Sequence, residues 1–74
     1  MKIYVAKTLI EYKTKSTCSV KLSTNLDEIR KYAKDEADIY ADTHWGRVEH
    51  PSDDKYIVYG DGIKVTISIE DHEV

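Results

Sequence analysis

The sequence has few of the residues that usually reveal a site or a cellular compartment. Its 74 residues include one cysteine, one proline, three glycines and no phenylalanine. A single cysteine excludes an internal disulfide, so nothing indicates an oxidising compartment. No apolar run approaches the roughly 18 residues of a membrane span, and no signal-peptide pattern is present. We therefore expect a cytoplasmic protein without a membrane segment, in which Cys18 is a small buried apolar side chain.

Patterns that indicate catalysis or cofactor binding are also missing. The glycines form no phosphate-binding loop, because Gly60-Asp61-Gly62 is explained by a tight hairpin turn. No serine or cysteine stands in a recognisable arrangement with a histidine, as nucleophilic catalysis would require. The three histidines have none of the spacings of zinc sites; they are His44, His50 and His72. We predict no enzyme activity, no cofactor and no metal site.

What the sequence does have is charge, and its distribution is uneven. Hydrophobic residues make up 41% and charged residues 34%, which is typical of one small globular domain spanning residues 1–74. Residues 1–24 hold five lysines against Glu11, a net charge of +4, whereas residues 25–74 hold six basic and thirteen acidic side chains, a net charge of −7. Charge that remains at the surface would steer partners and make binding depend on salt.

The segment from Asn25 to Thr43 is predicted to be an amphipathic helix. Its start is indicated because Thr24 and Asn25 can each cap a helix, with an acidic residue three positions after each. Gly46 is the expected stop. At 100° per residue one face collects the side chains that we expect to be buried: Leu26, Ile29, Ala33, Ala37, Tyr40 and His44.

Strands are predicted on both sides of this helix. Apolar alternation indicates four of them, at Lys2–Tyr12, Thr17–Ser23, Lys55–Tyr59 and Ile63–Ile69. The segment Arg47–Glu49 is either a short strand or part of a long loop, and residues 70–74 are expected to fray. The order predicts an α+β fold, a two-layer ββαββ domain with one helix across an antiparallel sheet of three or four strands.

Two apolar features need an explanation beyond this fold. In the first strand Ile3, Val5 and Leu9 form one face while Tyr4 begins another, so either both faces are covered or a bulge changes the register. One helix shields only one side of a sheet, which makes a homodimer an alternative to a monomer. Trp45, after the helix, is expected to close one end of the core.

The outer side of the helix carries a strip that stability does not explain. Tyr32 and Ile39 project away from the buried stripe beside acidic side chains, and Asp38 and Asp42 lie in the last two turns, where the helix dipole disfavours anions by roughly 0.3–1 kcal/mol each. Either these apolar groups are covered or ordinarily exposed, or they bind a partner. The predicted partner-binding residues, called the acidic strip below, are Glu28, Tyr32, Asp35, Ile39 and Asp42.

Two electrostatic alternatives remain open. Lys13, Lys15 and Lys21 in the first hairpin form a basic group that would contact nucleic acid or merely keep a strand edge solvated, and a pI near 5.5 argues against nucleic acid. Conversely, acidic side chains on one surface would imitate DNA. The candidates for such a surface are Glu28, Asp35, Asp38, Asp42, Asp53 and Asp54.

The prediction is thus a small non-enzymatic module that binds a protein partner through the outer face of its helix. Its size, composition and lack of catalytic patterns resemble, in general character, the small accessory proteins of phages and mobile elements. Many of those proteins bind and inhibit one host protein. This resemblance attaches to no particular residue.

Overall fold

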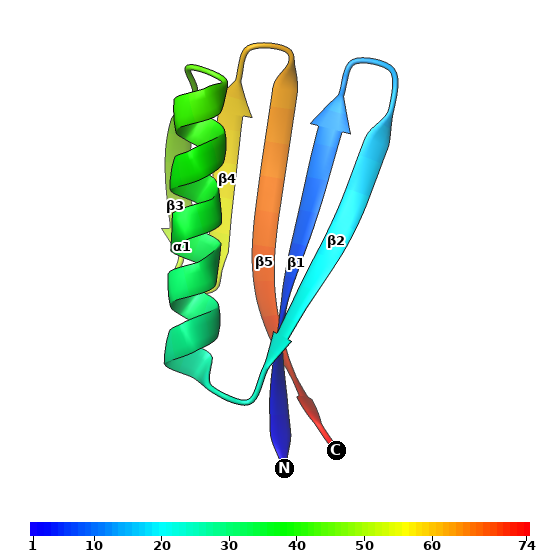
Figure 1. Ribbon diagram of the computed structural model, residues 1–74, viewed down its shortest axis with the longest axis vertical. Helices are drawn as coiled ribbons and strands as arrows, with labels where there is room; N and C mark the ends of the chain where they lie inside the picture. The colour runs from blue at the N-terminus through cyan, green and yellow to red at the C-terminus, as the bar shows by residue number, and fades with distance from the viewer.

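The computed structural model describes all 74 residues as one helix packed on one face of a five-stranded antiparallel sheet (Figure 1). The elements are β1 (Lys2–Tyr12), β2 (Ser16–Ser23), α1 (Leu26–Thr43), β3 (Arg47–Ser52), β4 (Lys55–Gly60) and β5 (Ile63–Glu73). The strands are arranged in the order β2-β1-β5-β4-β3. The α+β prediction is confirmed, but the predicted number of strands was too low. The one helix is not apolar enough to cross a membrane.

The additional strand is β3, at the edge of the sheet beside β4. Its pairing with β4 shifts register between Glu49 and Ser52, so the side-chain alternation is interrupted there. Pro51 lies in this interrupted part, and proline is compatible with an edge strand because one side of that strand makes no ladder hydrogen bonds. The strand alternative for Arg47–Glu49 is thus confirmed, and the bulge and the proline obscured its continuation to Ser52 in the sequence pattern.

The central strands β1 and β5 pair along their whole lengths. The register runs from Lys2 opposite Glu73 to Tyr12 opposite Ile63, with no bulge in β1. Strand β5 therefore extends beyond its predicted end, and the Val74 N–H donates to the Met1 carbonyl at 2.8 Å. The apolar alternation stops at Ile69, but the pairing continues, because the polar end of β5 forms a ladder with residues 2–5 of β1. As a result the two termini lie side by side (Figure 1).

The core lies between α1 and the β4–β5 part of the sheet. Ala33 and Ala37 on the helix and Val58, Val65 and Ile67 on the strands are all completely buried. Alanine at these helix positions lets the helix approach the sheet closely, and each larger side chain contributes roughly 1.5–3 kcal/mol through burial. The apolar side of β5 faces the helix, as predicted.

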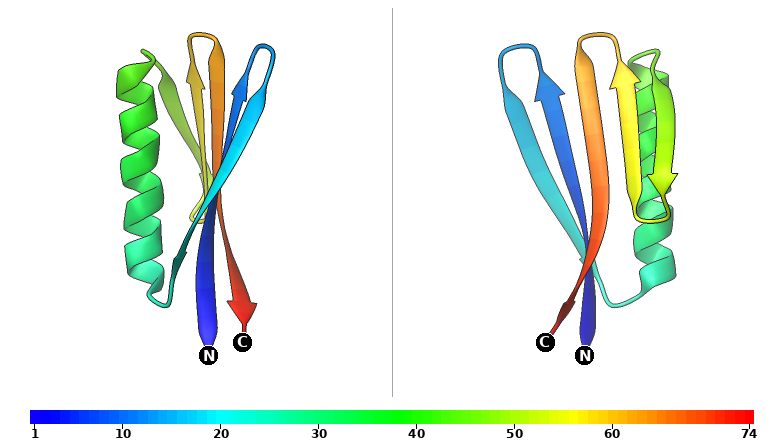
Figure 2. Two further views of the ribbon diagram at one scale, coloured as in Figure 1. Left: turned by 45° about the vertical axis from the view of Figure 1, so that its right-hand side comes forward. Right: turned by 180° about the vertical axis from the view of Figure 1, so that it is seen from behind.

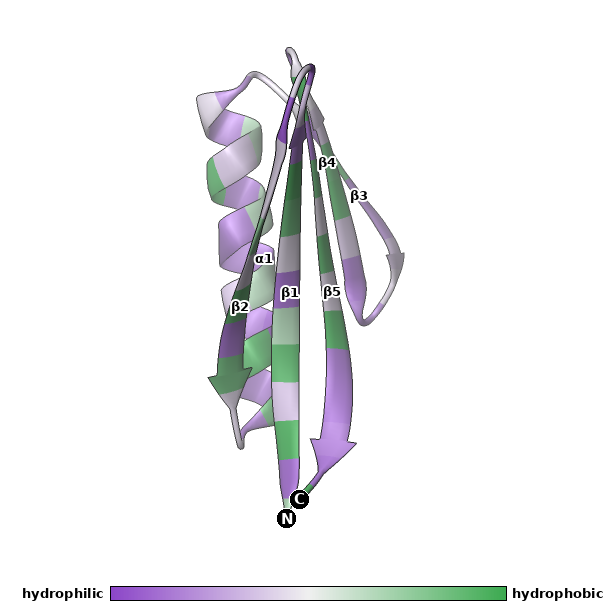
Figure 3. Cartoon of the chain, turned by 90° about the vertical axis from the view of Figure 1, so that its right-hand side faces the viewer, coloured by the Kyte–Doolittle hydropathy of each residue, from purple (hydrophilic) through white to green (hydrophobic).

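The helix contacts all five strands, most closely β4 and β5, but it covers only one face of the sheet. Figure 2 shows α1 beside β3 and β4, while the β1–β2 hairpin extends away from it. Every residue of β2 before Ser23 is exposed. Figure 3 shows apolar residues along β1 and β2, and three of them, Leu9, Val20 and Leu22, are exposed.

Candidate partner-binding surface

The end of α1 has an unusual backbone. His44 caps the helix, and its N–H donates to the Tyr40 carbonyl at 3.1 Å. Trp45 follows with φ of 53°, and the Gly46 N–H donates back to the Ala41 carbonyl at 2.8 Å. This is the pattern in which a left-handed residue ends a helix, a position that glycine usually occupies. Gly46 was predicted to be the stop, but the left-handed residue is Trp45.

Two glycines hold this turn against the β4–β5 hairpin. A Cβ atom on Gly46 would lie 2.8 Å from the Tyr59 carbonyl oxygen, and one on Gly60 would lie 2.8 Å from the His44 Cβ atom. The Asp61 N–H also donates to the His44 carbonyl at 3.2 Å. The backbone on both sides of Trp45 is therefore fixed by hydrogen bonds and close packing.

The Trp45 side chain itself is 96% exposed. The prediction that it closes the core was wrong, because the contact between Gly60 and His44 brings the hairpin against the helix end without it. A left-handed conformation costs a residue with a side chain roughly 1–2 kcal/mol. Trp45 thus has an unfavourable backbone conformation and gains almost nothing from burial.

The acidic strip is divided by the fold. Glu28, Asp35, Ile39 and Asp42 are exposed, with Ile39 at 57%, whereas Tyr32 is half-buried. The Lys21 ammonium lies 5.8 Å from the centre of the Tyr32 ring, so this tyrosine faces β2. Ile39 is the one large apolar side chain of the strip that is well exposed.

The surroundings of Tyr32 are reflected in its titration. Partial burial, followed by the nearby Glu36 carboxylate, raises the pKa of Tyr32 above its ordinary value. Burial and Glu36 also raise the pKa of Tyr40. Both phenols therefore stay neutral at physiological pH. Tyr32 is the member of the acidic strip that faces β2.

The C-terminal half of α1 is acidic and only partly compensated by nearby cations. Asp38 forms an ion pair with Lys34 at 3.7 Å, but the last turn has no basic residue to offset Asp42. In the sequence, Ile39 and Trp45 each lie three residues from Asp42, one before it and one after it. The result is two exposed apolar groups near uncompensated negative charge.

The six carboxylates proposed as a DNA imitation do not form one row. Glu28, Asp35 and Asp42 follow one another at two-turn intervals along one side of the helix. Asp54 instead pairs with Arg30 at 3.3 Å, and Arg30 projects from a different side of the helix. Three of the six carboxylates, Glu28, Asp35 and Asp42, therefore share one side of the helix.

The basic residues of the first hairpin are separated in a similar way. The Lys15 ammonium lies 5.3 Å from the centre of the Tyr12 ring near the hairpin tip, whereas Lys21 lies over Tyr32. At about 3.3 Å per residue, Lys15 and Lys21 are roughly 20 Å apart along β2. The three lysines do not converge on one point.

The face of the sheet turned away from α1, called the open face below, has an apolar part on β1 and β2. Val20 and Leu22 are 60% and 59% exposed, and Leu9 is 38% exposed. Cys18 lies opposite Leu9 and is also exposed, so the prediction that it is buried was wrong. The alternation in β2 was predicted correctly, but the pairing with β1, which decides which side of β2 faces the helix, was not visible in the sequence.

The open face also carries charged side chains. Lys7 and Glu70 form an ion pair there, and the Lys7 hydrogen bond holds the pKa of Glu70 below its ordinary value. Tyr59 lies between two cations, with Arg47 and Lys64 at 5.4 and 5.8 Å from its ring centre. The well-exposed aliphatic side chains of the open face therefore lie on β1 and β2.

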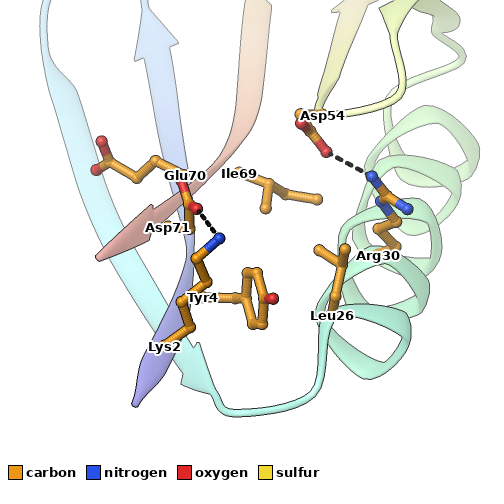
Figure 4. Close-up of a pocket in the computed structure, with 8 residues that line it drawn as sticks. All are labelled: Lys2, Tyr4, Leu26, Arg30, Asp54, Ile69, Glu70 and Asp71. Atoms are coloured by element: carbon orange, nitrogen blue, oxygen red, sulfur yellow. Dashed lines mark hydrogen bonds and ion pairs between the residues drawn. The ribbon is translucent and has the colours of Figure 1, made fainter. Parts of the chain in front are cut away.

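A cavity of about 200 Å³ lies between the start of α1 and the end of β5 (Figure 4). Tyr4 and Leu26 point into it, and two ion pairs border it, Lys2 with Asp71 at 3.2 Å and Arg30 with Asp54 at 3.3 Å. Ligand sites usually measure roughly 300–1,000 Å³. This small cavity, with its cations already paired, does not indicate a small-molecule site.

No cluster of three or more histidine, cysteine, aspartate or glutamate side chains is suited to hold a metal ion. Comparisons with protein-family models, with curated proteins and with solved structures found no match. The function must therefore be argued from the surfaces alone.

Proposed function

We propose that the protein is a non-enzymatic protein-binding module whose recognition surface is the outer and C-terminal part of α1. Trp45 and Ile39 are the apolar contacts, and Glu28, Asp35 and Asp42 are the acidic ones. The observation that carries this proposal is Trp45, which is 96% exposed at a φ of 53°. Neither its exposure nor its backbone contributes to stability, so a role in contact with another molecule accounts for it best.

The way in which Trp45 is held supports the same proposal. Its neighbours His44 and Gly46 are fixed by backbone hydrogen bonds to the helix, and Gly60 packs directly on His44. A tryptophan on a fixed backbone loses little conformational entropy on binding, and tryptophan is among the residues that most often dominate the energy of an interface. Trp45 is thus suited to be an anchor.

The chemistry of the surface defines the partner. Two exposed apolar side chains beside carboxylates fit a protein with an apolar pocket bordered by lysine or arginine. The acidic residues would speed association and make it sensitive to salt, while the apolar groups would supply most of the affinity. Occupying such a pocket on a host protein is also how an accessory protein inhibits without chemistry of its own.

The test is affinity capture from a nuclease-treated lysate with wild type, Trp45→Gly and Ile39→Asp as baits. Tyr12→Ser is the matched control, because it removes another exposed aromatic group, 40% exposed, from the β1–β2 end. We expect a protein that wild type and the control retain and that both helix variants lose. Purified, that protein should bind Trp45→Gly at least about tenfold more weakly, as expected for a hot-spot residue.

The proposal is wrong if the captured protein binds both helix variants as tightly as wild type. It is also wrong if recovery requires intact nucleic acid. Far-UV circular dichroism of each bait establishes that a loss of binding does not reflect unfolding.

A further inference from the structure

The two edges of the sheet are built differently. On one side, β3 has a bulge between Glu49 and Ser52 and contains Pro51, both of which obstruct pairing with another strand. On the other side, β2 pairs with β1 in one uninterrupted register and has neither proline nor bulge. An open strand of this kind presents a row of unpaired N–H and C=O groups.

The residues that present those groups follow from the ladder. The Tyr12 N–H donates to the Lys15 carbonyl at 2.7 Å, which makes this a hydrogen-bonded pair of the β1–β2 ladder. Because hydrogen-bonded and non-hydrogen-bonded pairs alternate, Thr17, Ser19 and Lys21 direct their backbone groups toward β1. The residues whose backbone groups point outward are Ser16, Cys18, Val20 and Leu22.

We propose that the free edge of β2 pairs antiparallel with β2 of a second copy of this chain, forming a homodimer with one continuous sheet. The register that uses every outward-pointing residue places Ser16 opposite the partner subunit's Leu22 and Cys18 opposite the partner subunit's Val20. The open faces of both copies then lie on one side of the continuous sheet, and both helices lie on the other. The apolar parts of their open faces become contiguous, and the cross-strand pairs Cys18–Val20 pack on each other.

Charge favours a second copy in this orientation. The turn with Lys13 and Lys15 and the start of α1 lie at opposite ends of β2 (Figure 1). Antiparallel pairing therefore brings the basic turn of each copy beside the partner's helix start, where Asp27 and Glu28 are exposed in the first turn. The same register places Lys21 opposite the partner subunit's Thr17, so no like charges meet directly.

The other ways of joining two copies are less favourable. Parallel pairing would bring the two basic turns together. Packing the open faces against each other would bury the charged half of that face, including the Lys7–Glu70 pair and the cations around Tyr59. Edge pairing leaves these charges in solvent.

The experiment measures mass against concentration by sedimentation equilibrium, for wild type, Val20→Pro and Leu9→Thr. Proline at position 20 removes an N–H that points away from β1, so it suits a monomer edge but blocks pairing. The symmetric loss of two hydrogen bonds should weaken the dimer about thirtyfold. Leu9 lies on β1, away from the edge, so Leu9→Thr should dimerise like wild type, with two chains of 8.5 kDa.

Crosslinking gives a second readout that does not depend on the proline variant folding. Cys18 is the sole cysteine, and in the proposed register the two copies of it are diagonal neighbours with Cα atoms about 7–8 Å apart. A bis-maleimide of that length should join them, whereas a direct disulfide requires a shorter separation, up to about 7 Å.

Several results would overturn the proposal. A wild-type mass that stays monomeric at all concentrations with no crosslink excludes the dimer. A dimer that survives in a folded Val20→Pro variant but is lost in Leu9→Thr indicates packing through the open face. Glu28 belongs to both surfaces, but Trp45 and Ile39 lie outside the β2 edge, so the Trp45→Gly and Val20→Pro variants test the two proposals separately.

Discussion

The two halves of the sheet differ in what they contribute. On the β4–β5 side the helix buries Val58, Val65 and Ile67 completely, whereas on the β2 side Val20 and Leu22 remain mostly exposed. The chain has therefore concentrated its stability in one half and left apolar side chains uncovered in the other. A small domain with a narrow stability margin gains nothing from uncovered apolar groups, so they are the residues to examine for function.

The largest contrast should come from truncating one buried and one exposed aliphatic side chain. Ile67→Ala removes a completely buried side chain from the central part of the core and should lower the free energy of unfolding by about 2–5 kcal/mol. Val20→Thr, on the free edge, should change it by less than about 0.5 kcal/mol at concentrations where the protein is monomeric. Urea unfolding followed by circular dichroism measures both. Similar losses of unfolding free energy in the two variants would mean that Val20 is packed in solution. The two halves of the sheet would then not differ in their contribution to stability.

A smaller effect is expected where the helix end contacts the β4–β5 hairpin. Gly60→Ala places a Cβ 2.8 Å from both the His44 Cβ and the Ile63 Cγ2 atoms, so it should destabilise the fold by about 1–3 kcal/mol. Thermal unfolding of this variant checks the value. Asp61→Ala, in the adjacent exposed turn, is the control and should unfold within a few degrees of wild type. Equal melting temperatures for wild type and Gly60→Ala would contradict the close packing that fixes Trp45.

The smallest effect concerns pH and the open face. Because the Lys7 hydrogen bond lowers the pKa of Glu70, folding is favoured while this carboxylate is ionised. That contribution is present above the ordinary glutamate pKa and is lost as the pH falls through the lowered value in the folded state. Urea unfolding measured at pH values from neutral to 3 should therefore show that the free energy of unfolding falls slightly less with acid for Glu70→Gln than for wild type. Identical slopes would mean that the ion pair does not persist in solution.

The parts of the fold that depend on local pattern were predictable. The strict alternation through Val65 and Ile67 identified β5 and the side that faces the helix, and the capping position of Asn25 fixed where α1 begins. Strand β3 was not settled, because Pro51 and the bulge interrupt its alternation and its pairing with β4 is not a local property.

The candidate sites were less predictable because they depend on contacts between distant segments. The Cys18 pattern was identified correctly, but its exposure follows from the register of β2 on β1, which places Cys18 opposite Leu9 on the face turned away from α1. Trp45 would ordinarily be assigned to a core. Its exposure depends on Gly60 packing against His44, a contact that no spacing in the sequence indicates.

Trp45 is assigned to partner binding chiefly because stability does not explain its exposure and its backbone. Equilibrium urea unfolding of Trp45→Gly and Trp45→Ala beside wild type tests it. We expect Trp45→Ala to match wild type and Trp45→Gly to be unchanged or more stable by up to about 1 kcal/mol, because glycine removes the strain of the left-handed backbone. A loss of more than about 1 kcal/mol in both variants would show that the indole packs against the fold, and the main reason for assigning Trp45 to partner binding would be gone.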